Sequence, residues 1–241
     1  MPETNEMIRY SVITVKNPRE IVLLRGRGCE WRKCRFCDYH LDFCKEESEN
    51  FRLNSEALSH VTGEYHRLEV INSGSFTDLD ESTMKRIMDV CDEKEIGEIH
   101  FECHWMHRES VPALRAQFAE KGIHVNVKIG VETFDSLFRE SYLVKGIDTD
   151  QPSEIARYFD EVCLLQGIPG QSASSMEKDI ETGLSYFSRV CVNIMVANSM
   201  PVKPDPRVIA EFQKIVLPKY EANERVDLLM ENTDFGVGGI A

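Results

Sequence analysis

Three cysteines lie close together on one segment, directly after an apolar stretch. Cys29, Cys34 and Cys37 follow the pattern C-x4-C-x2-C, and residues 21–24 before them are apolar enough for a buried strand. Three thiolates on one loop can hold three irons of a [4Fe–4S] cluster and leave the fourth iron open to a small molecule. The spacing therefore predicts an iron–sulfur site with one exchangeable position.

Zinc is the alternative metal for this loop. Structural zinc takes four ligands, usually as two Cys/His pairs, and only Cys34 and Cys37 form a close pair here. His40 or Cys44 would have to complete a tetrahedral zinc site. Because Cys44 lies apart from the other three, we expect it not to be a ligand of a cluster. The loop predicts a metal site, and the rest of the chain must indicate which metal.

Five cations crowd this loop of an otherwise acidic protein. They are Arg25, Arg27, Arg32, Lys33 and Arg35. Nearby positive charge lowers the pKa of a thiol and offsets the charge of an anionic cluster. We therefore expect lowered pKa values for the cysteines of the loop.

Length and composition favour one domain in a reducing compartment. The 241 residues carry evenly spread apolar segments, which predicts a single domain over residues 1–241, with residues 1–20 as a strand extension. No run of 18 apolar residues is present, so we expect no membrane contact. The polar N-terminus has no signal peptide, and the eight cysteines suggest reduced thiols, so we expect a cytoplasmic protein.

The net charge of −13 argues against a nucleic acid partner. There are 41 acidic residues against 28 basic ones, and no basic run outside the cysteine loop. Proteins that grip DNA or RNA normally present a basic face, because phosphate contacts supply most of the non-specific affinity. A small-molecule substrate is the better expectation.

Short apolar strands alternate with amphipathic helices along the chain, about six times. Strands are predicted at residues 8–15, 21–25, 68–71, 99–101, 125–131, 162–165, 190–196 and 226–230. Helices are predicted at residues 54–60, 80–90, 110–120, 134–142, 174–187 and from 205 onward, with Asn54 as the first N-cap and Ser174 opening a capping box. This alternation predicts an α/β fold with a parallel sheet. Six short units, with no seventh or eighth, predict an open, partial TIM-type (β/α)6 barrel.

Polar and glycine residues gather just after the predicted strands, where such folds place their active sites. They include Asn72, Ser73, Gly74 and Ser75 after one strand, Glu102 and His104 after the next, then Glu132, and finally Gln166 and Gly167.

These segments together resemble the radical S-adenosylmethionine (SAM) enzymes. Members carry an aromatic residue before the third cysteine, as Phe36 is here, and a GGE-like segment at the position of residues 72–75. Residues 130–135 (GVETFD) and 167–171 (GIPGQ) match two later segments of the family. Two features depart from the usual pattern: one residue is inserted between the first two cysteines, and serine replaces the acid of the GGE-like segment.

The resemblance implies a [4Fe–4S] cluster on Cys29, Cys34 and Cys37 and SAM chelated to its open iron. It implies SAM-binding residues at Phe36, Asn72, Ser73, Gly74, Ser75, Lys128, Glu132, Gln166 and Gly167. It also implies an electron donor such as flavodoxin or ferredoxin.

A subgroup of this family, the queuine lyases, is similar to the chain in size, in the cysteine spacing and in residues 72–78 and 231–236. These enzymes release the cyclopentenediol of queuine and return 7-aminomethyl-7-deazaguanine (preQ1). This resemblance implies a lyase acting on a 7-deazaguanine base, with residues 231–241 as a possible lid. Expected catalytic residues are Glu102, His104 and Asp234, and expected substrate-binding residues are Glu102, Asn193, Asn198, Glu231 and Asp234. A radical SAM enzyme with another target (a tRNA base, a sugar or a peptide) and a zinc-binding module without catalysis remain the alternatives.

Overall fold

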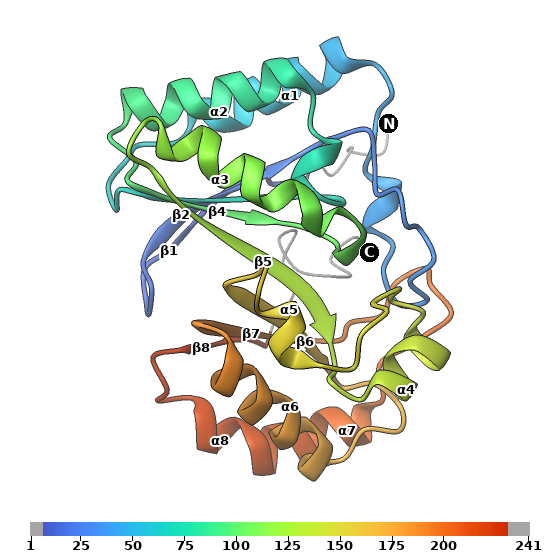
Figure 1. Ribbon diagram of the computed structural model, residues 1–241. Coiled ribbons are helices and arrows are strands. Elements are labelled where there is room, and N and C mark those ends of the chain that lie inside the picture. The colour runs from blue at the N-terminus through green and yellow to red at the C-terminus, as the bar shows by residue number, and fades with distance from the viewer. Residues whose placement is uncertain (1–6, 231–241) are drawn as a thin grey trace, which may run out of the picture.

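Eight strands form one curved sheet in the computed structural model, which describes residues 7–230 (Figure 1). The strands are β1 (Tyr10–Ile13), β2 (Arg19–Leu24), β3 (Arg67–Asn72), β4 (Glu98–Glu102), β5 (His124–Glu132), β6 (Glu161–Gln166), β7 (Arg189–Ile194) and β8 (Val226–Leu229). They lie side by side in chain order, and β1 alone runs antiparallel to its neighbour. Because β1 and β8 do not pair, the barrel stays open. The predicted α/β partial barrel is confirmed.

Helices connect successive parallel strands and cover the outer face of the sheet (Figure 1). They are α1 (Glu47–Ser59), α2 (Glu81–Glu93), α3 (Val111–Ala119), α4 (Ser136–Phe138), α5 (Pro152–Ile155), α6 (Ala173–Tyr186), α7 (Pro206–Glu211) and α8 (Leu217–Tyr220). Outward-facing strand residues such as Val70, Phe101 and Val127 pack against helix residues such as Ile87 and Phe118. The main hydrophobic core therefore lies between the sheet and the helices.

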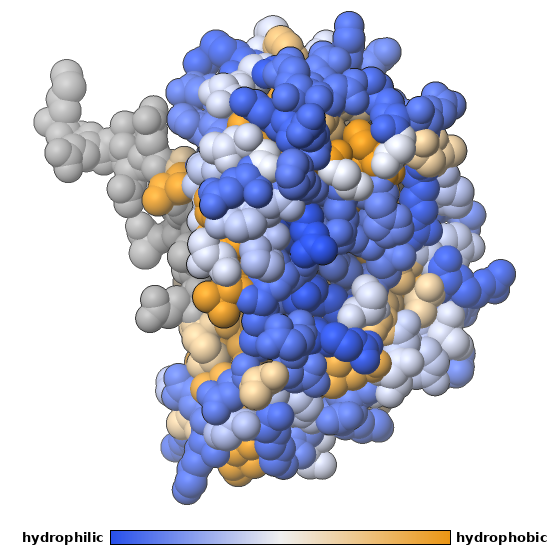
Figure 2. Space-filling view, turned by 90° about the vertical axis from the view of Figure 1, so that its left-hand side faces the viewer, coloured by the Kyte–Doolittle hydropathy of each residue, from blue (hydrophilic) through white to orange (hydrophobic). Residues whose placement is uncertain are grey.

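The inner face of the sheet is polar by contrast. Buried charged side chains project from its middle strands, among them Glu69, His100, Lys128 and Glu161. Alternation along a strand sends successive side chains to opposite faces, so the same strands supply the apolar core and this polar interior. The end of the barrel where the parallel strands begin faces the viewer in Figure 2, and it is mainly hydrophilic with small scattered hydrophobic groups.

Two predicted helix starts are wrong. The first helix begins at Glu47 rather than at Asn54, whose amide group instead exchanges hydrogen bonds with the backbone of Arg25. The helix predicted from Ser174 begins at Ala173, with Ser172 accepting a hydrogen bond from the Ser175 amide. In both cases a polar residue inside the helix offered a competing capping signal: Asn54 lies eight residues after the N-cap Glu46, and Ser174 lies two residues after the N-cap Ser172.

Two other starts are confirmed. Asp80 caps α2 by accepting from the Thr83 amide, and Asp205 caps α7 in the same way. Within residues 7–230, no helix is long and apolar enough to cross a membrane.

Candidate active site

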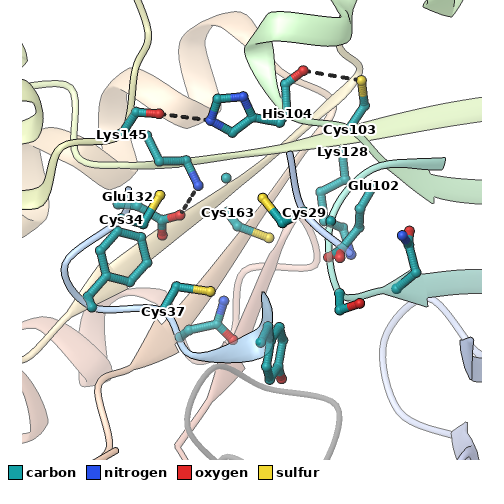
Figure 3. A pocket seen from close by; sticks show the side chains of 17 residues that line it. Cys29, Cys34, Cys37, Glu102, Cys103, His104, Lys128, Glu132, Lys145 and Cys163 are labelled. Carbon is teal, nitrogen blue, oxygen red and sulfur yellow. Dashed lines mark hydrogen bonds and ion pairs between the residues drawn. The ribbon is translucent and has the colours of Figure 1, made fainter. Parts of the chain in front are cut away.

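A cavity opens on the inner face of the sheet, where the parallel strands end (Figure 3). The predicted site residues that line it are Cys29, Cys34, Phe36, Cys37, Asn72, Ser73, Gly74, Glu102, His104, Lys128, Glu132 and Asn193. They come from the loop after β2 and from the ends of β3, β4, β5 and β7. Segments far apart in the sequence are thus brought to one place, as the parallel topology predicts.

Cys29, Cys34 and Cys37 line one side of this cavity, on the loop after β2 (Figure 3). All three are partly exposed free thiols. Cys44 lies outside the cavity, and its thiol donates to the Glu49 carboxylate at 3.3 Å. The structure thus separates Cys44 from the other three, in the way that the spacing predicts.

Backbone hydrogen bonds from two sides hold the cysteine loop. The Arg27 amide donates to the carbonyl of Asp78 at 2.9 Å, and the Arg35 amide donates to that of Leu143 at 3.0 Å. The Arg35 carbonyl in turn accepts from the Val202 amide at 2.9 Å. The loop is therefore fixed by the segments that follow β3, β5 and β7.

Gly74 lets the cysteine loop pass close to the end of β3. A β-carbon at this position would lie 2.9 Å from the Cα of Cys29, closer than side chains normally approach a backbone. Glycine is thus required here by packing, which explains its place in the GGE-like segment.

Burial raises the pKa of two of the thiols. The pKa of Cys34 rises to about 11 and that of Cys37 to about 12, with the Lys145 ammonium acting in the opposite direction. The lowered pKa values expected from the basic loop are therefore wrong for these two thiols. The arginine and lysine side chains of the loop point to solvent, so their effect is outweighed by desolvation.

The segment after β3 presents an acceptor with no partner. Asn72 donates from its amide nitrogen to the Ser75 carbonyl at 2.9 Å, but its buried Oδ1 has no hydrogen-bond partner among the described residues. The Ser75 hydroxyl accepts from the backbone amide of His104 at 2.9 Å and does not line the cavity. Ser75 therefore joins the ends of β3 and β4, while Asn72 leaves an acceptor at the cavity wall.

A β-bulge in β5 directs Glu132 into the cavity. The register to β6 shifts between Gly130 and Glu132, and Glu132 has a φ of 70°, a region that non-glycine residues rarely occupy. Its carboxylate pairs with the Lys145 ammonium at 2.8 Å (Figure 3). A β-carbon at Gly130 would lie 2.6 Å from the Glu132 Oε1, so the glycine makes room for this pair.

Lys145 is carried by residues 139–149, which we call the strap. The buried guanidinium of Arg139 donates to the Thr149 carbonyl at 2.6 Å. The neighbouring Glu140 accepts from the Gly146 amide at 2.6 Å. These bonds join the two ends of the strap and fix the lysine between them.

His104 anchors the strap to the end of β4. Its Nε2 donates to the Lys145 carbonyl at 2.8 Å (Figure 3). Its ring stacks on Trp31 with centroids 5.5 Å apart. Burial and the nearby Lys145 charge lower the pKa of His104 to about 3, so the ring is neutral. With Nδ1 accepting from the Met106 amide as well, His104 acts as a positioning residue for the strap.

Glu102 faces the cavity beside Lys128 (Figure 3). Burial raises the pKa of Glu102 to about 7, with Lys128 opposing the rise and Glu69 adding to it. Lys128 itself is bound to the Glu69 carboxylate deeper in the barrel. Glu102 therefore changes charge near neutral pH.

Three other predicted residues do not line the cavity. Gln166 is fully buried at the end of β6, and neither end of its amide has a hydrogen-bond partner among residues 7–230. Gly167 follows it with a φ of 90°. Asn198 donates to the Phe36 carbonyl at 2.7 Å, so it supports the cysteine loop. Glu231 and Asp234 lie outside the described residues.

The comparison with solved structures supplies the decisive observation. A queuine lyase from Clostridium spiroforme, solved with SAM and queuine bound, is 42% identical in sequence with a TM-score of 0.90. The match covers 96% of this chain and 99% of that one. The chain belongs to the queuine lyase family of radical SAM enzymes. No protein-family model and no curated protein matches it.

Membership in the queuine lyase family leaves the two alternatives without support. Among residues 7–230, no three His, Cys, Asp or Glu side chains converge to hold a single metal ion. His40, offered as a zinc ligand, places its Nδ1 3.1 Å from the Cys37 carbonyl oxygen.

Sequence reasoning missed several residues of the queuine lyase cavity. Lys145, Tyr39, Cys103 and Cys163 line it as well. Tyr39 follows the cysteine loop closely. Cys163 pairs in register with Cys191 of β7, so alternation along β6 could have indicated it. No sequence pattern indicates that Lys145 lines the cavity, because it lies in an irregular segment between a helix and the next strand.

Proposed function

We propose that this protein is a queuine lyase that uses a [4Fe–4S] cluster and SAM to cleave the C–N bond of queuine, giving preQ1. The observation that carries this proposal is the 42% identity, over nearly the whole chain, with a queuine lyase solved with SAM and queuine. The cavity at the strand ends, lined by three thiols and by Glu102 and Glu132, supports it.

The donor set fits the cluster. Three partly exposed thiols from one loop border an open cavity, which suits three irons with a protein ligand and one without. When bound, the cluster and SAM supply a 5′-deoxyadenosyl radical that takes a hydrogen atom from the substrate. Cys29, Cys34 and Cys37 would hold the cluster, and the Lys145 ammonium beside Cys34 and Cys37 would offset its negative charge.

The SAM site lies between the ends of β3 and β5. The unpartnered Oδ1 of Asn72 is an acceptor for the ammonium group of SAM, since a buried polar atom without a partner costs about 1–3 kcal/mol. Glu132 has one carboxylate oxygen on Lys145 and lines the cavity, so its other oxygen would accept from the ribose or the methionine end of SAM. Gln166, with both ends of its buried amide unpartnered, has the same need for a ligand.

The substrate side of the cavity is formed by Glu102 and Asn193. The pyrimidinone edge of a 7-deazaguanine offers two neighbouring N–H donors, which one carboxylate can accept as a pair. Glu102 fits this role, because its carboxylate lines the cavity and, within residues 7–230, is not bound to a hydrogen-bond donor. Glu231 and Asp234, which lie outside the described residues, stay candidate substrate-binding residues, and residues 231–241 stay a candidate lid.

Aromatic side chains beside the cysteines would form a wall between the bound cluster and solvent. Phe36 is buried between the second and third cysteines, and Trp31 stacks on His104 beside them. Such a wall excludes water and stray hydrogen donors, which a radical reaction requires. The eight free cysteines support a protein of the reducing cytoplasm.

The test is an anaerobic incubation of the reduced, cluster-loaded enzyme with SAM and queuine. We expect 5′-deoxyadenosine and preQ1 in parallel, with neither formed by the Cys34→Ala variant. If queuine leaves SAM cleavage at its background rate while another base or nucleoside stimulates it, the queuine assignment fails.

A further inference from the structure

Lys128 has two neighbouring carboxyl groups and is bound to one of them. Its ammonium group pairs with the buried carboxylate of Glu69 on β3. Glu102 is its register partner on β4, and the side chains of Lys128 and Glu102 both line the cavity (Figure 3). Among residues 7–230, however, no donor is bound to the Glu102 carboxylate. Glu69 thus has the lysine that Glu102 lacks.

Glu69 is itself fixed by a second cation, at the start of β2. Arg19 donates from its Nε to the other carboxylate oxygen of Glu69 at 2.5 Å, and both side chains are buried. Burial favours the neutral form of each group, but Lys128 and Arg19 hold the pKa of Glu69 well below its ordinary value. Against burial, Glu69 in turn holds the pKa of Lys128 well above its ordinary value. The ion pair is therefore charged throughout the working pH range.

The other charged groups around this pair already have partners. The strap lysine also faces Glu102, but it is bound to Glu132 at 2.8 Å. Glu161, the register partner of Lys128 on β6, pairs with His100 at 3.2 Å. A Lys128 released from its present partner would therefore find Glu102 as the neighbouring carboxyl group that is not yet bound.

We propose that Glu69 is a positioning residue for substrate binding, which holds Lys128 back and so keeps the Glu102 carboxylate open for the base. This rests on the proposed function, in which Glu102 accepts the two N–H donors of a 7-deazaguanine. An ammonium group bound to Glu102 would compete with those donors, so the base would first have to displace an ion pair. Glu69 does not line the cavity, so it acts through Lys128 and not by contact with the base.

The Glu69→Gln variant tests this, because glutamine keeps the shape of the side chain and can still accept from Arg19, but no longer holds the lysine by charge. Anaerobic titration with queuine between pH 6 and pH 9, in the presence of SAM, gives the affinity of the cluster-loaded protein. We expect about tenfold weaker binding than wild type at pH 8, the loss typical of a hydrogen bond to a charged group. The midpoint of the pH dependence should move from about pH 7 to below about pH 6, because an ammonium partner lowers the pKa of Glu102.

Glu69→Gln combined with Lys128→Met separates capture of Glu102 from damage to the fold. The double variant removes the released ammonium group together with its partner, and a neutral pair is well tolerated in place of a buried ion pair. Queuine affinity at pH 8 and the midpoint near pH 7 should both recover. Asp227→Asn is the matched control, since it removes a buried carboxylate that pairs with Arg189 at 2.8 Å and does not line the cavity. Its queuine affinity should equal that of wild type.

Three results would overturn the positioning role of Glu69. The first is weak binding in the double variant, and the second is an equal loss in Asp227→Asn, because either would reduce Glu69 to a structural residue. The third is a shifted midpoint in Glu69→Gln with wild-type affinity at pH 8, because Glu69 would then act through its charge alone. If Glu69→Gln loses its circular dichroism signal, Glu69→Asp replaces it and should show an intermediate loss of affinity. A wild-type protein that does not bind queuine would instead overturn the proposed function, and this proposal with it.

Discussion

Burial shifts the pKa values of two residues at the end of β4 in opposite directions. It raises the pKa of Glu102 to about 7 and lowers that of His104 to about 3, because a buried site favours the neutral form of each group. His104 is thus neutral throughout the working range, while Glu102 changes charge within it. Of these two expected catalytic residues, Glu102 therefore responds to pH and His104 holds the strap.

Queuine binding should depend on the ionisation of Glu102. A carboxylate accepts a pair of N–H donors and a protonated carboxyl group does not, so the affinity should fall about tenfold per pH unit below pH 7 and level off above it. Anaerobic binding titrations in the presence of SAM measure this. The Glu102→Gln variant should bind more weakly and lose the pH dependence, and an identical pH profile in this variant would exclude Glu102 as the titrating group.

Iron content should separate the three loop cysteines from Cys44. Cys29→Ala, Cys34→Ala and Cys37→Ala each remove a cavity-lining thiol, and each should reduce the iron bound after anaerobic reconstitution to near background. Cys44→Ala should retain it, because that thiol contacts Glu49 outside the cavity. Iron loss in Cys44→Ala, measured beside a normal circular dichroism spectrum, would contradict the three-ligand assignment.

At the scale of elements, the bulge of β5 shapes the SAM site that we propose. Gly130→Ala would place a methyl group 2.6 Å from the Glu132 Oε1 and 2.9 Å from the Lys145 Nζ, so it should separate this ion pair. We expect SAM affinity to fall about tenfold, the loss typical of a charge-assisted hydrogen bond, while iron content stays normal. Equilibrium binding of SAM to the cluster-loaded protein measures this.

Gly97→Ala provides the control for the Gly130 variant. A β-carbon at Gly97 meets nothing within 4 Å, so SAM affinity should be unchanged there. Equal affinities in the two variants would mean that the Glu132–Lys145 pair does not contribute to SAM binding.

The strands and the strap show what the sequence could predict. Strands β2, β3 and β6 are short apolar segments, and their local pattern was enough to place them within one or two residues. The strap shows no regular hydrophobic periodicity, because its backbone is irregular. It contains a π-helical turn (Arg139–Leu143) and Val144 with a φ of 58°. Its shape comes from bonds such as Arg139 to Thr149, which depend on the folded backbone. Lys145 could therefore not be assigned to the site from sequence.

Across the whole molecule, the curved sheet separates an apolar core outside from a charged interior within. Arg19 pairs with Glu69 and lies 3.7 Å from Asp227, while Arg189 pairs with Asp227 at 2.8 Å. These buried groups are linked in one network beneath the cavity, and Lys128 connects it to Glu102. Because each buried charge has a partner of opposite sign, the network tolerates its low-dielectric setting.

His100 should make the stability of the whole fold depend on pH. Its Nδ1 lies 3.2 Å from the Glu161 carboxylate, and its acidic partners, Glu161 and Glu98, outweigh burial and raise its pKa from 6.5 to about 9. The folded state therefore holds this proton more tightly than the unfolded chain. The contribution of His100 to the free energy of unfolding is complete below pH 6.5, falls as pH rises, and is lost above about pH 9, a difference of up to about 3 kcal/mol.

Urea unfolding at pH 6 and pH 9.5 should show the gap in free energy of unfolding between wild type and His100→Asn shrinking by up to that amount. The exposed His124→Asn control should show no such change, and a gap for His100→Asn that is constant with pH would mean that His100 is uncharged in the folded protein.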